Sequence, residues 1–389
     1  MEHLYETMQR LLNNTTSSFL RYSYNDINWN NRMFGLVGPR GVGKTTLFLQ
    51  RIKKEHGAHG ALFVSADDIY FADHTLFGTA EALYKQGVKH FYIDEVHKYG
   101  PWSQELKAMY DSFPELHVYF TGSSVLDIEK GEADLSRRAP KYLMQGLSFR
   151  EFLAMRYEVN MDALPLENIL QNEARIPGID HPLPLFDEYL KNGYYPFGQD
   201  PDFEIELGQV VNRTLEVDIP QFANMTASTG RKLKRLLAIV STLVPFKPNM
   251  VKLASQVQVS RNSLEDYLLY IEKAGLIAQL RRPGSSLGQL AKAEKVYLDN
   301  PNLIFCLADD NVDQGTVRET FFFNQMRVRN NVSSSPASDF EIDGKTFEVG
   351  GKNKTGKQLE GVDDGYVVKA DIEYGHGNVV PLWAFGLNY

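Results

Sequence analysis

The sequence has almost no cysteine and no long apolar run. Its 389 residues include one cysteine, Cys306, which excludes an intrachain disulfide and a cysteine-based zinc cluster. No apolar run approaches the ~18 residues that cross a bilayer, and the first residues lack the basic and then apolar build of a signal peptide. We therefore expect no membrane contact and predict a cytoplasmic protein of two or three domains.

The chain also lacks an excess of positive charge. It has 41 Lys+Arg and 49 Asp+Glu, a net charge of −8, which argues against a protein built as a whole to coat nucleic acid. The charge is uneven, however, because residues 231–299 hold 12 basic and 5 acidic residues and carry +7. This asymmetry predicts a basic module within an acidic protein.

Four short apolar segments recur at a constant spacing in the N-terminal third. The predicted strands are 33–37, 61–64, 89–93 and 117–120, and they begin 28 residues apart; helix-length segments such as 45–55 and 104–113 lie between them. This spacing matches βαβ units of about 30 residues, whose parallel strands are buried on both faces. We therefore predict an α/β fold with a ligand site beyond the carboxyl ends of its strands.

A glycine-rich motif follows the first predicted strand and opens a helix. Its residues, with the threonine that follows, are Gly38, Pro39, Arg40, Gly41, Val42, Gly43, Lys44, Thr45 and Thr46. The run satisfies G-x-x-x-x-G-K-[ST], in which glycines let backbone N–H groups turn toward phosphate oxygens at a helix N-terminus. Lys44 is expected to reach the β- and γ-phosphates and Thr45 to ligate Mg²⁺, so ATP and Mg²⁺ are the predicted cofactors.

Two carboxylates end the third predicted strand, as in a Walker B motif. The strand reads His90-Phe91-Tyr92-Ile93 and is followed by Asp94 and Glu95. Asp94 is expected to hold Mg²⁺ through water, and Glu95 to polarise the attacking water as the base for hydrolysis. The sequence therefore predicts an ATPase, with ATP and ADP as its small-molecule partners.

These motifs, in this order, resemble the prokaryotic AAA+-type ATPases. The resemblance rests on GPRGVGKTT at 38–46, YIDEVHK at 92–98, FTGSS at 120–124 and LSFREFL at 147–153. It implies a P-loop NTPase sheet followed by a helical lid, a winged helix and a restriction-endonuclease-like α/β domain. The implied boundaries are 1–154, 155–228, 229–300 and 301–389.

The resemblance also implies roles for three further residues. Ser123, after the fourth strand, stands where AAA+ enzymes carry a polar sensor of the γ-phosphate. Arg137 and Arg138 stand just before LSFREFL, where either one is a candidate arginine finger. A solvated basic turn explains the two arginines equally well, and the choice between them, in cis or in trans, stays open.

Residues 231–299 have the pattern of a winged helix. The predicted helices are 231–243, 250–257 and 261–274, with Ser260 as the N-cap of the third and Leu264, Leu268 and Ile271 on its buried side. Candidate contacts to double-stranded DNA are Arg261, Asn262, Arg281 and Arg282, since the +7 charge favours phosphate. Winged helices also pack against proteins, so a protein partner stays open.

The C-terminal acids resemble a nuclease core that lacks its lysine. Asp339 and Glu348 keep the acidic positions, while the lysine position is Gly350, and Lys352 reaches the site only if the strand bulges there. We therefore predict a degenerate domain without nuclease activity.

Two functions stay open for the whole chain: an ATPase that remodels or regulates a partner, with DNA as the first candidate, and a nucleotide-dependent switch with little turnover. A P-loop kinase is a weaker third. The oligomeric state is not predicted.

Overall fold

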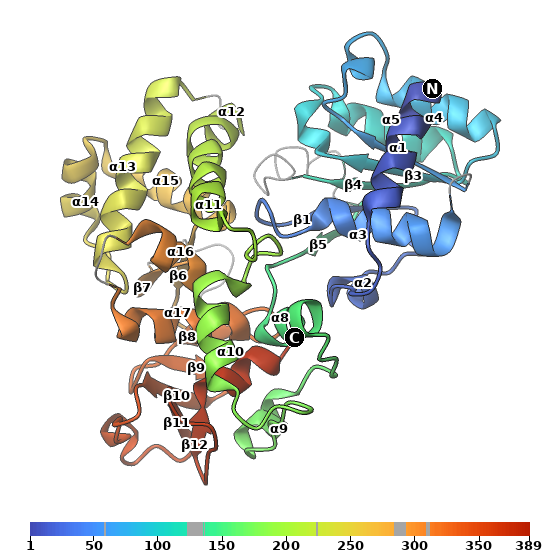
Figure 1. The fold of residues 1–389 in the computed structure, drawn as a ribbon. Helices are drawn as coiled ribbons and strands as arrows, with labels where there is room; N and C mark the ends of the chain where they lie inside the picture. The colour runs from blue at the N-terminus through green and yellow to red at the C-terminus, as the bar shows by residue number, and fades with distance from the viewer. Residues whose placement is uncertain (58–59, 123–134, 136, 223–224, 284–292, 309–311) are drawn as a thin grey trace. The chain divides into compact units, whose positions relative to one another are not determined.

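The chain forms two compact units. The structure is a computed structural model that describes all residues except 58–59, 123–134, 136, 223–224, 284–292 and 309–311. The units are Met1–Gly146 and Leu147–Tyr389 (Figure 1). The first contains most of the predicted ATPase core, and the finer boundaries at residues 154, 228 and 300 stay predictions. Every helix among the described residues is too short or too polar to span a bilayer.

The first unit is built on a parallel sheet of five strands. These are β1 (Met33–Val37), β2 (Ala61–Ser65), β3 (His90–Asp94), β4 (His117–Thr121) and β5 (Lys141–Leu143). Their order is β2-β3-β4-β1-β5, and every neighbouring pair is parallel. The four predicted strands are confirmed to within one residue at each end, and β5 is an addition. The order places β4 between β1 and β3, so the strand ends that carry the two predicted motifs flank the end of β4.

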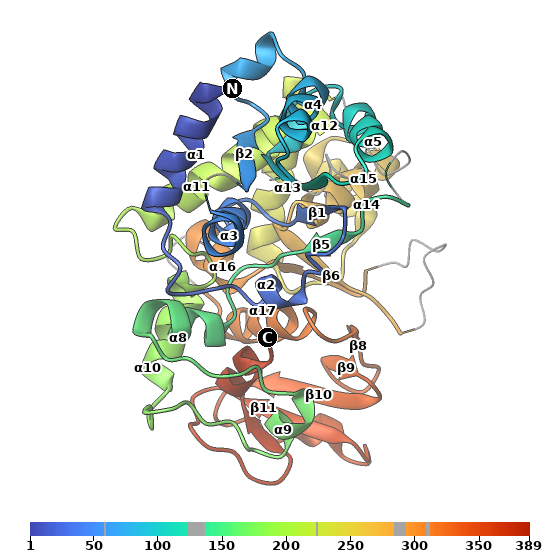
Figure 2. The ribbon, with the colours of Figure 1, turned by 90° about the vertical axis from the view of Figure 1, so that its right-hand side faces the viewer.

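Helices cover both faces of this sheet. They are α1 (Glu2–Asn14), α2 (Ser23–Asp26), α3 (Lys44–Arg51), η1 (Ile52–His56), η2 (Ile69–Ala72), α4 (Leu76–Lys85), η3 (Val96–Lys98) and α5 (Trp102–Ser112). Figure 2 shows α1 and α3 on one side of the sheet and α4 and α5 on the other. Neighbouring residues of β4 point to opposite faces: Tyr119 faces Phe34 and Trp29, while Phe120 lies beside Trp102 of α5.

The second unit begins with helices and ends with a sheet. Its helices before the first strand are α8 (Phe149–Tyr157), α9 (Leu166–Leu170), α10 (Leu183–Glu188), η4 (Tyr189–Gly193), α11 (Phe203–Arg213), η5 (Thr214–Asp218), α12 (Ile219–Phe222), α13 (Ala227–Leu243), α14 (Met250–Val257) and α15 (Arg261–Lys273). The antiparallel pair β6 (Ile277–Leu280) and β7 (Lys295–Leu298) follows. The Ser260 hydroxyl caps α15 by accepting the Ser263 N–H at 3.1 Å, and Leu264, Leu268 and Ile271 are buried, as predicted.

A mixed sheet closes the second unit. After α16 (Pro301–Leu307) and α17 (Gln314–Met326) come β8 (Val332–Ser334), β9 (Phe340–Ile342), β10 (Lys345–Gly350), η6 (Lys357–Leu359), β11 (Gly365–Lys369), β12 (Val379–Pro381) and η7 (Leu382–Leu387). The strand order is β12-β11-β10-β9-β8, parallel among the first three and antiparallel among the last three. Phe322 of α17 packs against Phe340, Phe347 and Phe385, which anchors the helix on this sheet.

Candidate functional site: a phosphate loop and its carboxylates

The predicted phosphate loop lies between β1 and α3, and the side chain of its Lys44 is hydrogen-bonded to the loop's own backbone. Lys44 is 6% exposed, and its Nζ donates hydrogen bonds to the carbonyl oxygens of Gly38 (2.8 Å) and Pro39 (2.7 Å). Gly43, at the helix N-cap, has φ +98°, a left-handed conformation that glycine adopts without strain. The loop therefore has the backbone turn and the buried cation that a phosphate group requires. Thr45 is half-buried, whereas Thr46 is exposed.

Asp94 lies at the mouth of this loop between two hydroxyl groups. The Thr45 Oγ1 donates to its Oδ2 at 2.7 Å, and the Thr121 Oγ1 donates to its Oδ1. Burial raises the pKa of Asp94, while the hydrogen bonds from Thr121 and Thr45 oppose that rise. Thr45 comes from α3, Asp94 from β3 and Thr121 from β4, so the strand order brings the three together.

Glu95 is held in an uncommon backbone conformation beside Asp94. Its φ is +50°, and its N–H donates to the Thr121 Oγ1 at 3.1 Å. A left-handed conformation at a non-glycine residue costs about 1–3 kcal/mol and persists only where the surroundings impose it. The Thr121 hydroxyl thus donates to the Asp94 carboxylate and accepts from the backbone N–H of Glu95.

Thr121 is not among the site residues predicted from the sequence. The residue predicted for this role after the fourth strand is Ser123, which lies outside the described residues. The available signal was a hydroxyl residue at the last position of an otherwise apolar strand. Its significance depends on β4 lying next to β3, which sequence spacing alone does not give.

The two candidate arginines differ in their surroundings. Arg137 is exposed. Arg138 pairs with Asp111, with 3.1 Å between its Nε and the carboxylate Oδ1, and its guanidinium lies 5.9 Å from the Tyr110 ring centroid. Of the two, Arg138 is therefore already engaged by a carboxylate within its own unit.

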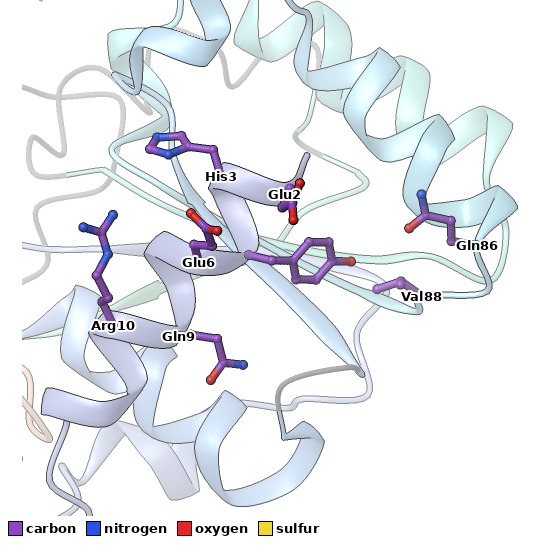
Figure 3. A pocket seen from close by; sticks show the side chains of 8 residues that line it. Glu2, His3, Glu6, Gln9, Arg10, Gln86 and Val88 are labelled. Carbon is purple, nitrogen blue, oxygen red and sulfur yellow. The ribbon is translucent and has the colours of Figure 1, made fainter.

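The oxygen donors at the loop fit Mg²⁺. A hydroxyl and a carboxylate are hard oxygen ligands of the kind Mg²⁺ prefers, and this cation is usually held by one or two protein groups together with phosphate oxygens and water. The described residues include no cluster of three or more His, Cys, Asp or Glu side chains arranged for a metal. Thr45 and Asp94 therefore suit a magnesium ion that arrives with a nucleotide. A groove of about 990 Å³ elsewhere on the first unit is lined by α1 and by Gln86 and Val88, not by this loop (Figure 3).

The acids of the C-terminal sheet are paired with lysines. The Lys354 Nζ lies 3.2 Å from the Glu348 Oε1, and a Cβ on Gly350 would be 2.6 Å from the Lys354 Cδ. Lys354 therefore occupies the space beside Gly350, whereas Lys352 is exposed. The Lys295 Nζ lies 3.3 Å from Asp339 and 3.2 Å from Glu319. Neither Lys354 nor Lys295 is predicted from the sequence to contact these acids.

Three of the four candidate DNA contacts form ion pairs within the second unit. Arg261 pairs with Glu265 (3.2 Å), Arg281 with Glu272 (2.6 Å) and Arg282 with Glu294 (2.7 Å). Asn262 is exposed. These three of the 12 basic residues of this segment are therefore engaged by neighbouring carboxylates.

Comparison with known proteins gives two matches to families. Residues 30–153 match the AAA domain, and residues 183–313 match a domain of unknown function (DUF8612). No curated protein sequence matches the chain.

Among solved structures, the Walker-type ATPase PABY2304 of Pyrococcus abyssi is 16% identical, with a TM-score of 0.47 over 74% of this chain and 95% of its own. PCH-2 of C. elegans is 12% identical, with a TM-score of 0.26 over 69% of this chain and 67% of its own. Residues 30–153 have the sequence pattern and the sheet of an AAA-type P-loop domain.

Proposed function

We propose that the protein binds ATP with Mg²⁺ in the loop 38–45 and hydrolyses it. The observation that carries this proposal is the position of Asp94, held between Thr45 and Thr121 at the mouth of a loop that matches the phosphate-binding pattern. Glu95, the next residue, is the proposed base that orients and deprotonates the attacking water. Mg²⁺, when bound, supplies charge neutralisation between the phosphates.

Two substitutions separate binding from turnover. Lys44→Ala removes the buried cation aimed at the phosphates and is expected to weaken ATP binding by tenfold or more. Glu95→Gln keeps the shape of the site and removes the base, so binding persists while hydrolysis falls by about 10²-fold. Nucleotide-binding isotherms and phosphate release are the measurements.

Matched controls lie in the same unit. Lys85→Ala and Glu115→Gln change an exposed lysine and an exposed glutamate and should leave both readouts at the parental level. Hydrolysis by Glu95→Gln at the parental rate would show that Glu95 is not the base. ATP binding by Lys44→Ala as tight as that of the parent would show that the loop is not the site.

We further propose Arg137 as the arginine that contacts the γ-phosphate, because Arg138 is engaged with Asp111. Arg137→Ala is expected to lower kcat while Arg138→Ala does not. The reverse result would assign the role to Arg138.

The proposed partner of the hydrolysis cycle is double-stranded DNA, with residues 229–300 as a winged helix. The support is the +7 charge of this segment and the exposed Arg231, Arg235 and Lys252 on α13 and α14. When binding is carried by phosphate contacts, the logarithm of the binding constant falls linearly with the logarithm of the salt concentration. Neutralising two such contacts makes this slope shallower by about 2. Fluorescence anisotropy of the parent and of Arg231→Ala/Arg235→Ala at several salt concentrations tests this. No binding at low salt would leave a protein partner as the remaining candidate.

A further inference from the structure

A buried arginine joins the phosphate loop to the end of the first unit. Arg21, between α1 and α2, is 5% exposed. One of its terminal nitrogens donates to the carbonyl oxygen of Val42 in the phosphate loop at 2.6 Å. The other donates to the carbonyl oxygens of Gln145 and Gly146, both at 2.8 Å. Gly146 is the last residue of the first unit, so a single planar group spans the loop and the point where the chain leaves this unit.

The same terminal segment also contacts the start of the loop. The Met144 N–H donates to the carbonyl oxygen of Val37 at 2.8 Å. A Cβ on Gly38 would lie 2.1 Å from the Met144 carbonyl oxygen, so only glycine permits this approach. Residues 144–146 thus contact the start of the phosphate loop directly, through Met144, and are linked to Val42 through Arg21.

Occupancy of the loop must change the hydrogen bonds next to this segment. Lys44 now donates to the carbonyl oxygens of Gly38 and Pro39. A phosphate group is a stronger acceptor for an ammonium group than a neutral carbonyl, so a bound nucleotide draws Lys44 away from both. Gly38, which loses this partner, is the residue that touches Met144.

We propose that Arg21 is a positioning residue that couples occupancy of the phosphate loop to the segment Met144–Gly146. Since the guanidinium is rigid and buried, and donates at both ends, a displacement of Val42 moves Gln145 and Gly146 with it. The inference rests on the proposed nucleotide binding. Through Arg21, nucleotide binding in the phosphate loop shifts the segment that leads into the second unit.

Hydrogen exchange in the full chain tests the coupling. The Met144 and Gln145 amides, which donate to Val37 and to the Tyr22 hydroxyl, are the reporters. In the parent, saturation with ATP and Mg²⁺ is expected to change their exchange rates by about fivefold or more. Arg21→Met, saturated with nucleotide as shown by its own binding isotherm, should lose this change.

Arg32→Met is the matched control. Arg32 donates to the carbonyl oxygens of Tyr110 (2.8 Å) and Phe113 (3.2 Å) in the same unit, but it touches neither the loop nor residues 144–146 in the contacts the structure describes. Its replacement should also remove carbonyl hydrogen bonds and yet leave the nucleotide-dependent change intact. A merely structural role for Arg21 predicts that the two variants behave alike, which would overturn the inference.

The remaining outcomes are distinct. A parent that binds no nucleotide overturns the proposed function, whereas a parent that binds nucleotide without a change at Met144 and Gln145 overturns the coupling alone. Persistence of the change in Arg21→Met also overturns it. If Arg21→Met fails to fold, Arg21→Lys takes its place, because it keeps the charge but cannot span both sides of the bridge.

Discussion

At the scale of single residues, Thr121 is the position whose role the structure defines most sharply. Its hydroxyl donates to Asp94 and accepts from the Glu95 N–H. Thr121→Val keeps the shape and removes both hydrogen bonds, so we expect kcat to fall about 10- to 100-fold, the equivalent of one or two buried hydrogen bonds. Thr121→Ser should restore most of the activity because it restores the hydroxyl group. Steady-state phosphate release measures the effect.

The control for this prediction is Thr79→Val. Thr79 is a buried threonine of α4, and its hydroxyl donates to the Thr75 carbonyl oxygen away from the loop. The Thr79→Val variant should have a lower free energy of unfolding than the parent and the same rate of ATP hydrolysis. A Thr121→Val variant that hydrolyses ATP as fast as the parent would remove Thr121 from the site.

We expect His90 to make the stability of the first unit depend on pH. Its ring stacks on His56 with 3.9 Å between centroids, and His117 lies at 5.1 Å. Burial, and then the charges of His56, His117, Arg51 and Lys89, lower the pKa of His90 to about 3. Below pH 6.5 the unfolded chain therefore binds a proton that the folded chain refuses, and stability falls as pH falls from 6.5 toward 3.

For each pH unit below 6.5, we expect His90 to lower the free energy of unfolding by up to about 1 kcal/mol, a value reduced for its partial exposure to solvent. His90→Thr, which suits a strand, should flatten this dependence in urea unfolding between pH 7.5 and 5. The exposed His74→Thr should leave it unchanged. An equal slope in the parent and in His90→Thr would contradict the assignment.

At the scale of elements, β10 depends on a lysine from outside the strand. Glu348 has a side chain 4% exposed, and Lys354 is its ion-pair partner. Removing one partner of a buried pair leaves an uncompensated charge, so Lys354→Ala should cost about 3 kcal/mol of unfolding free energy. Lys352→Ala, at an exposed position two residues away, should stay within about 0.5 kcal/mol of the parent. Chemical unfolding of the second unit distinguishes the two.

The same pair bears on nuclease activity. Lys354 pairs with Glu348, and the single Lys295 is shared by Asp339 and Glu319, so each of the three acids already has an ammonium partner. We therefore expect no cleavage of plasmid or single-stranded DNA in Mg²⁺ or Mn²⁺. Cleavage by the parent that both Glu348→Ala and Lys354→Ala abolish would show an active nuclease.

At the scale of the whole molecule, the two units should respond differently to nucleotide. A ligand at 100 times its Kd stabilises the unit that binds it by about 2.7 kcal/mol. We expect calorimetry of the full chain to show two transitions, of which ATP with Mg²⁺ raises only that of residues 1–146. Lys44→Ala should abolish the rise, and a shift in the other transition alone would place the nucleotide site in the second unit.

Turnover with and without DNA separates the two functions considered for the whole chain. Stimulation of hydrolysis supports a remodelling ATPase, whereas slow hydrolysis that DNA does not change supports a switch.

Sequence alone predicts four strands of the first sheet and the loop proposed to bind phosphate. Apolar runs at a spacing of 28 residues gave four strands to within a residue, and the glycine pattern placed Lys44 and Thr45 at the start of a helix. These features are local, because strand burial, helix capping and loop conformation are set by residues close in sequence. Asp94 followed for the same reason, as the last residue of an apolar strand.

Contacts between residues far apart along the chain depend on how the strands and helices pack. Strand order put Thr121 against Asp94, a long connection brought Arg21 between Val42 and Gly146, and Lys354 filled the space beside Gly350. The contacts of Thr121 and Arg21 join residues 21 to 125 positions apart, so their distance in space does not follow from their spacing along the chain. The ion pairs of Arg281 with Glu272 and of Arg282 with Glu294 likewise form only when a strand packs beside a helix or another strand, whereas Arg261 and Glu265 are already neighbours one turn apart on α15.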